Sequence, residues 1–600
     1  MSGAKRFPYA GVADADGHAL GPPGVWERYT APYNLNEEDI VAYDIVIKNG
    51  LVVDGTGGAP YRADVAIRGE RIAAVGKITD RAERTIEAEG HLVTPGFVDI
   101  HTHLDAQISW DPIASSSCWH GVTSVVMGNC GVTFAPCRPQ DREYLAHLME
   151  SVEDIPAETI MAGMAWTWET YGEYLKALDA LPKGVNVGGL VGHCAVRYWA
   201  MGEESLENKP ASPEAIVRMH DVVAEAIAGG ALGFSTSRTI LHRTPEGQPV
   251  PGTFATFDEL MGIAKALGEL RRGVVEAAPG IDSGRPADIE REVRWMTEVS
   301  LATGRPVTFG LAQSRPYPDV YASMLAQVSA STARGARIFA QSTTRGIGVL
   351  FGFVNRTPFD RAPSWRALRT LRLEEKVAKL RDPEHRATMI REALDDPPPI
   401  DFGQIFLLPG GEARYDHRPD ESLQAHAQRL GVSPAEAFIV LSVEKEGKAL
   451  FNYPFLNPEF AAVEKMLDHP QVVIGLGDSG AHCGQIMDSS LPTYFLKYWV
   501  QERQHFTVAQ AIRKLTSEPA WLFGIQDRGV IRQGAYADLN VIDYDQLRLP
   551  PPTFVYDLPA GGGRYIQKSS GYKYTLVNGQ VFMEGLEPTG AFAGRVLRSA

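Results

Sequence analysis

Residues 94–105 read TPGFVDIHTHLD and place two histidines at the end of a short apolar run. Side chains at positions i and i+2 of a β-strand point to the same side, so His101 and His103 are expected to share one face. In a parallel α/β barrel, the carboxyl ends of the strands form the rim that carries the active site. The stretch therefore predicts a barrel strand that ends in a pair of imidazoles.

The sequence from residue 96 to residue 524 alternates apolar runs of strand length with helix-like segments. The runs include SVVMGNCG, VNVGGLVGH, ALGFSTS and QVVIGLGDSG. Alternation of this kind over such a length predicts an α/β fold, a TIM-like (β/α)8 barrel. A charged helical segment at about 355–425 is expected as an insertion outside the barrel.

Both ends of the chain are rich in short β-branched runs. Residues 43–95 are punctuated at Asn49-Gly50, and residues 525–600 at Asn578-Gly579. Asn-Gly is a strong signal for a tight hairpin turn. We expect a small β-sandwich domain formed from both chain ends, preceded by a polar N-terminal arm over residues 1–42.

The composition excludes several classes of protein. The chain is 44% hydrophobic and 22% charged, which is typical of globular domains. Its 58 basic and 73 acidic side chains leave a net charge of -15, which argues against nucleic-acid and membrane partners. Five cysteines are too few for a disulfide scaffold and indicate a cytoplasmic protein. A small-molecule substrate is the expected partner, and a homo-oligomer is left open.

Two further strand ends carry side chains suited to metal binding. Asp478 ends the apolar run in QVVIGLGDSGAH, where a buried carboxylate needs a metal or another strong partner. The alternative interpretation of Asp478 is a helix N-cap. Cys130 lies in SVVMGNCGV, and a thiolate beside imidazoles suits zinc better than magnesium. The alternative for Cys130 is an ordinary buried thiol.

From about residue 43 to residue 585 the chain resembles the amidohydrolase superfamily, most closely its D-aminoacylase (N-acyl-D-amino-acid deacylase) branch. The motifs are PGFVDIHTH, GNCG, GDSGAH and the tail RKLTSEPAWLFGIQDRGVIRQGAYADLNVID. The resemblance implies a barrel with a metal site at its mouth. By motif matching, it implies that the metal ligands are His101, His103, Cys130 and Asp478.

The chain also departs from that branch. Ala278 and Leu311 stand where the branch has two further metal-binding histidines. Gln313 and a position near Ser342 replace the lysine and tyrosine that the branch offers to the substrate carboxylate. Since the second ligand set is missing, we expect one Zn²⁺ per chain.

Other polar residues are expected near the mouth. His193, in GGLVGHCAVR, matches a Gly-His segment of the branch and is predicted to polarise the substrate carbonyl or else to be structural. Glu276 lines the pocket, adds an oxygen ligand or forms hydrogen bonds at its strand end. The residues predicted to contact the substrate, unless they are ordinary surface residues, are Arg197, Arg238, His242, Gln313, Arg345 and His482, with Arg315 as a further cation.

These residues predict a metal-dependent hydrolase that cleaves a C–N amide bond in an N-acylated amino acid or a related small amide. Zinc would lower the pKa of water toward ~7. Asp478 would take the water proton and pass it to the leaving amine. Two alternatives remain: a cyclic-amide or lactone hydrolase, and a barrel that has lost catalysis and serves as a binding scaffold.

Overall fold

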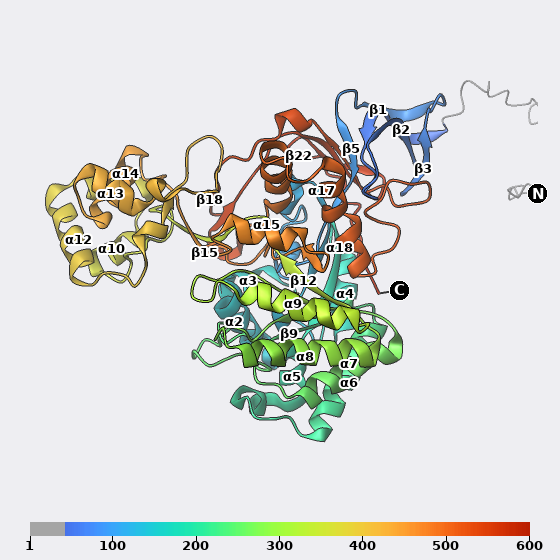
Figure 1. Ribbon diagram of the computed structural model, residues 1–600, viewed down its shortest axis with the longest axis horizontal. Coiled ribbons are helices and arrows are strands. Elements are labelled where there is room, and N and C mark those ends of the chain that lie inside the picture. The colour runs from blue at the N-terminus through green and yellow to red at the C-terminus, as the bar shows by residue number, and fades with distance from the viewer. Residues whose placement is uncertain (1–41, 600) are drawn as a thin grey trace, which may run out of the picture.

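The computed structural model describes residues 42–599. The arm predicted for residues 1–42 therefore lies outside the described residues, apart from residue 42. Among the described residues, no helix combines the length and the apolar character that crossing a bilayer requires. Figure 1 shows a strand-and-helix body, a sheet beside it and a separate helical lobe.

The body is built on an 8-stranded parallel sheet that curls into a nearly closed barrel. Its strands in chain order are β6 (Phe97–Asp99), β7 (Val122–Met127), β8 (Asn186–Gly192), β9 (Gly233–Ser237), β10 (Val274–Ala278), β11 (Val307–Gly310), β12 (Ile338–Ser342) and β16 (Val472–Ile474). Beyond β6 and β16 the chain pairs again, because the Asp478 amide donates to the His101 carbonyl at 3.1 Å. This pairing joins the first and last strands and confirms the predicted barrel.

Helices cover the outside of the strands (Figure 1). They are α2 (Arg142–Glu153), α3 (Ala157–Gly163), α4 (Tyr171–Ala180), α5 (His193–Met201), α6 (Pro213–Ala228), α7 (Phe257–Leu270), α8 (Pro286–Thr303), α9 (Val320–Ala333), α15 (Phe460–Asp468), α16 (Leu491–Tyr494), α17 (Val508–Leu515) and α18 (Ser517–Leu522). In α6, Ser212 caps the helix and Pro213 begins it. The residues that α6 buries, among them Met219, Val223 and Ala226, recur at helical spacing.

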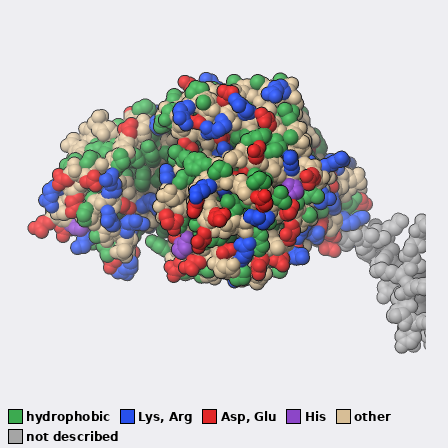
Figure 2. Space-filling model, turned by 90° about the horizontal axis from the view of Figure 1, so that it is seen from below, with side chains coloured by type: hydrophobic (Ala, Val, Ile, Leu, Met, Phe, Trp, Pro, Cys, Tyr) green, Lys and Arg blue, Asp and Glu red, His purple; other side chains and the backbone are tan. Residues whose placement is uncertain are grey.

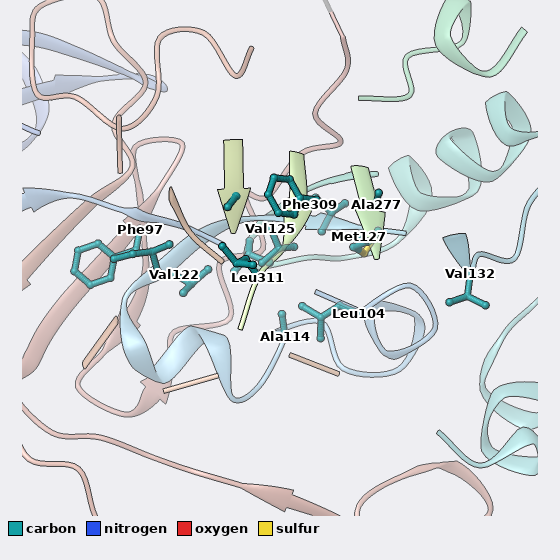
Figure 3. Packing of buried hydrophobic residues seen from close by; sticks show 14 of the residues in the cluster. Phe97, Leu104, Ala114, Val122, Val125, Met127, Val132, Ala277, Phe309 and Leu311 are labelled. Atoms are coloured by element: carbon teal, nitrogen blue, oxygen red, sulfur yellow. The ribbon is translucent and has the colours of Figure 1, made fainter. Parts of the chain in front are cut away.

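Buried apolar side chains fill the barrel, as Figure 3 shows around Phe309 and Val125. Leu311, one of the two positions where the sequence resemblance implies a replaced histidine, belongs to this cluster and is 0% exposed. Close packing of this kind leaves that position apolar and without a metal donor.

The two chain ends form one 9-stranded sheet, in which β17 pairs antiparallel with β5. Its strands are β1 (Tyr43–Val52), β2 (Tyr61–Arg68), β3 (Arg71–Gly76), β4 (Ala82–Glu87), β5 (Leu92–Pro95), β17 (Leu539–Ile542), β20 (Tyr572–Val577), β21 (Gln580–Glu584) and β22 (Glu587–Pro588). Side chains from both ends, including Ile47, Val93 and Leu539, share one apolar cluster. The prediction that the chain ends build a common domain is confirmed.

A lobe is inserted between β12 and β16. It contains a small sheet of β13 (Ile347–Phe351), β14 (Phe406–Leu407) and β15 (Phe451–Leu456), and the helices α10 (Pro363–Ala367), α11 (Leu373–Arg381), α12 (Pro383–Asp395), α13 (Leu423–Leu430) and α14 (Pro434–Glu444). Trp365 and Phe438 lie at the centre of its own core. A further two-stranded sheet pairs β18 (Thr553–Val555) with β19 (Arg564–Ile566). Figure 2 shows acidic and basic side chains interspersed over the lobe and the body.

Candidate metal centre

The His101 and His103 side chains lie together at the carboxyl end of the barrel. Each side chain is 1% exposed, and the two ring centroids are 5.6 Å apart. The amide of His103 donates to the Ser479 carbonyl at 2.8 Å, which fixes the chain beyond β6 against the chain beyond β16. The structure thus places both imidazoles on one face, as the i, i+2 spacing predicts.

Cys130 reaches the same place through a tight turn after β7. Its φ is 57°, and the flanking Gly128 and Gly131 have φ values of 75° and 76°. A Cβ at Gly128 would lie 2.3 Å from the Leu190 carbonyl oxygen, so only glycine fits there. The turn leaves Cys130 Sγ 3.4 Å from His101 Nε2.

Asp478 completes the group from the last barrel strand. Its Oδ1 atom lies 3.4 Å from His101 Nε2 and 3.9 Å from His103 Nε2. This oxygen is buried and has no hydrogen-bond partner. The next helix in the described chain begins only at Leu491, so Asp478 is not the N-cap of a helix.

Gln341, the residue before the last of β12, orients the His101 ring. Its Oε1 atom lies 2.9 Å from His101 Nδ1 inside the protein. A proton on Nδ1 leaves the lone pair of Nε2 free to bind a metal ion on the side where Cys130 and Asp478 lie. Burial lowers the pKa of His101, and it lowers the pKa of His103 further because other histidines lie nearby. Both imidazoles are therefore neutral, which is the form that binds metals.

The donor set fits a zinc ion. One ligand atom from each of His101, His103 and Cys130 lies within 4.8 Å of the other two. Donors at ordinary zinc distances in a tetrahedron are separated by about 3.3 to 3.6 Å, close to the observed 3.4 Å contacts. A set of nitrogen, sulfur and carboxylate donors suits zinc and does not suit magnesium or calcium. The unpartnered Asp478 Oδ1 atom is the oxygen that such an ion would satisfy.

Two buried carboxylates border this group. Glu276, on β10, is 0% exposed and accepts a hydrogen bond from the Cys130 amide at 2.9 Å. Burial raises the pKa of Glu276 to about 8. Glu153, the last residue of α2, was missed by the sequence analysis, although it continues the buried stripe of Ala146 and Met149 at helical spacing. Its Oε2 atom lies 3.6 Å from His103 Nε2.

Two of the predicted substrate contacts, His242 and His482, do lie beside the group. Burial, with the neighbouring His482 and His101, lowers the pKa of His242 to about 4. Nδ1 of His242 is 2.8 Å from the Ser237 hydroxyl. Nε2 of His482 is 3.7 Å from Glu153 Oε2, and its side chain is 24% exposed.

His193 and Arg197 lie in a different cluster. The imidazole of His193 contacts Thr236 Oγ1 at 2.8 Å through Nδ1 and Glu259 Oε1 at 3.1 Å through Nε2. Arg197 donates to the same Glu259 oxygen at 3.3 Å and to the Lys209 carbonyl. Both nitrogens of His193 are therefore engaged, and the residue holds α5 against α7 instead of facing the metal group.

Two other arginines that were predicted to contact the substrate are also paired with carboxylates of the protein. Arg238 pairs with Glu292 at 3.0 Å, and Arg345 pairs with Asp488 at 2.7 Å. A buried guanidinium needs a carboxylate partner, and these partners could not be identified from the sequence.

The remaining polar candidates are also held by the protein. Arg315 donates to the Pro454 carbonyl at 3.3 Å. The side-chain oxygen of Gln313 accepts a hydrogen bond from the backbone amide of Glu459 at 3.3 Å. The backbone amide of Gln313 donates to Asn457 Oδ1 at 2.7 Å. These contacts fix the chain after β11 against the chain after β15.

Comparison with known proteins places this chain in a family. A model described as the amidohydrolase family matches residues 84–583. An uncharacterized protein of Mycobacterium tuberculosis is 29% identical over 562 residues, which are 85% of this chain and 86% of that protein. An N-acyl-D-glutamate deacylase of Alcaligenes xylosoxydans xylosoxydans is 30% identical over 559 residues, which are 92% of this chain and 96% of that protein.

A solved structure shares the fold. It is an N-acyl-D-glutamate deacylase from Bordetella bronchiseptica complexed with zinc and a phosphonate inhibitor that mimics the tetrahedral intermediate. It has a TM-score of 0.61 and 24% identity, and the match covers 93% of this chain and 99% of that one. Because the family model spans most of the chain, the protein belongs to the amidohydrolase family, in its D-aminoacylase-like branch of metal-dependent hydrolases.

Proposed function

We propose that the protein hydrolyses the C–N amide bond of an N-acylated amino acid or a related small linear amide. The observation that carries this proposal is the convergence of His101, His103 and Cys130 with the unpartnered carboxylate of Asp478. Family membership supports it, as does the related deacylase that was solved with zinc.

The four residues would hold one zinc ion. When bound, zinc supplies a Lewis acid that polarises the scissile carbonyl and lowers the pKa of water toward ~7. Gln341 keeps the His101 ring turned toward this position, and Glu276 holds the turn that presents Cys130. These contacts fix the donors before substrate arrives.

Asp478 moves the proton in this proposal. Its Oδ1 atom faces both imidazoles and makes no hydrogen bond within the protein. With Oδ1 turned toward the metal position, the other carboxylate oxygen can accept a proton from the attacking water and return it to the nitrogen of the departing amine. Its φ of 44° holds the backbone in a left-handed conformation that orients this side chain.

The surroundings suit a reducing compartment. All five cysteines, Cys130 among them, are free thiols. Free thiols are consistent with the cytoplasm, which we propose as the location. The proposed partner is the small-molecule substrate.

The proposal is tested with Asp478→Asn and, as a control with the same chemical change, Asp221→Asn on the exposed side of α6. Turnover of a panel of N-acyl-D- and N-acyl-L-amino acids is followed by release of free amine, and zinc content by elemental analysis. Asp478→Asn is expected to lose about 10²- to 10⁴-fold in kcat, the usual contribution of acid–base catalysis. A fully active Asp478→Asn enzyme, or a wild-type protein without metal, would refute the proposal.

A further inference from the structure

We propose that Glu153 is an additional ligand of the metal ion and that His482 orients its carboxylate. This inference rests on the metal centre proposed above. It adds an oxygen donor carried by a helix outside the barrel, whereas the other donors all follow barrel strands.

The Glu153 carboxylate lies beside one of the donors, His103. Glu153 Oε2 lies 3.6 Å from His103 Nε2, within the 3.4 to 3.9 Å range that separates His101 and His103 from Asp478. Groups that share one ion are spaced in this way. Helix α2 ends at Glu153 because Asp154 adopts a left-handed φ of 53°, so the side chain of the last helical residue is held at the mouth of the barrel.

The charge of Glu153 also calls for a cation. Glu153 is 2% exposed, and its Oε1 atom is buried without a hydrogen-bond partner. Within residues 42–599, the ion-pair contacts of its carboxylate are to His103 and His482, and none is to lysine or arginine. Burial raises the pKa of Glu153, and the nearby acids Asp478, Asp105 and Glu276 raise it further. A carboxylate buried among acids is costly unless a cation compensates it, and a divalent ion beside His103 would do so.

His482 holds Glu153 in place from outside the metal group. The amide of His482 donates to the Glu153 carbonyl, and its Nε2 atom lies 3.7 Å from Glu153 Oε2. Backbone and side chain of one residue thus contact the same glutamate. An outer residue that orients a ligand in this manner is a common feature of metal sites.

The test compares wild-type protein with Glu153→Gln, Glu153→Asp and the control Glu150→Gln, an exposed glutamate one turn earlier on α2. Metal-free samples are titrated with Zn²⁺ against a competing chelator. The visible spectrum is recorded after loading with Co²⁺, and melting temperatures are measured with and without metal. His482→Ala is measured in the same way.

Glu153→Gln is expected to weaken zinc binding by about 10-fold or more and to change the cobalt spectrum. Glu153→Asp retains the charge but shortens the reach, and it should also change the spectrum. Glu150→Gln should match wild type, and His482→Ala should weaken zinc binding less than Glu153→Gln does. The melting temperature of metal-free Glu153→Gln should not fall, since a neutral amide of the same shape replaces a buried carboxyl group that has no lysine or arginine partner in the described part of the chain.

Zinc affinity and cobalt spectra that match wild type in both Glu153 variants would overturn the assignment. Failure of both metal-free variants to fold would also overturn it, because Glu153 would then be a structural residue. A wild-type protein that binds no zinc would instead refute the proposed function itself.

Discussion

The contact between Gln341 and His101 allows the metal site to be perturbed without touching a donor. Gln341 Oε1 lies 2.9 Å from His101 Nδ1, and Gln341 is 0% exposed. Gln341→Leu keeps a similar volume and removes the acceptor, so the ring loses both its preferred tautomer and its orientation. Losses of such outer contacts usually lower metal affinity 10- to 100-fold, or about 1.4 to 2.8 kcal/mol of binding free energy.

The companion variant Gln341→Glu should act in the opposite direction. A carboxylate facing Nδ1 makes the imidazole a more basic ligand, so zinc affinity should equal or exceed that of wild type. The assay is competition with a chelator on metal-free protein, with Gln428→Leu on the lobe helix α13 as a distant control. Wild-type zinc affinity in Gln341→Leu would show that Gln341 does not orient the His101 ring. Weaker zinc binding in both variants would instead indicate that the substitutions disturb the packing at this position.

Two further outcomes follow from the buried charges. Arg345→Met should lower the free energy of unfolding by about 3 to 5 kcal/mol, because it leaves Asp488 buried and unpaired. The KM for substrate should stay unchanged. A raised KM with an unchanged melting temperature would instead make Arg345 a substrate contact. Burial raises the pKa of Glu276 from its ordinary 4.5 to about 8, so the folded metal-free protein keeps a proton that the unfolded chain releases. The stability of the metal-free protein should therefore fall as pH rises from about 5 toward 8. Glu276→Gln should flatten the plot of melting temperature against pH. The same plot in the variant as in wild type would show that Glu276 does not cause the fall.

The barrel and the joined terminal sheet were predictable because their signals are local. Alternation fixes which side of a strand a residue faces, so His101 and His103 could be placed on one face from their spacing alone. Cys130 and Asp478 could be found because each ends an apolar run, where a polar side chain must reach the rim. In each of these cases the residue and the element that positions it are neighbours in the sequence.

The arginines predicted to contact the substrate show what neighbouring sequence cannot reveal. Arg197, Arg238 and Arg345 all lie at or near the ends of predicted strands. Each forms an ion pair with a carboxylate that lies farther along the chain, by 62, 54 and 143 residues respectively. Whether a cation faces a ligand or a partner is decided by tertiary packing, which brings the acid to it. For the same reason, Glu153 could not be identified as a site residue from the sequence. Its position in a helix reveals that it faces inward, but only the approach of α2 to His103 reveals what it faces.

The paired arginines and the unpartnered acids together constrain the chemistry at the mouth of the barrel. The arginines that the sequence offered for a substrate carboxylate are already paired, while the acids Glu153, Glu276 and Asp478 surround the imidazoles with buried oxygens that lack partners. A metal ion held by this group would balance charge that the described arginines do not balance. A substrate carboxylate would then be attracted mainly by that ion, and activity on anionic amides should depend on metal loading more steeply than activity on neutral ones.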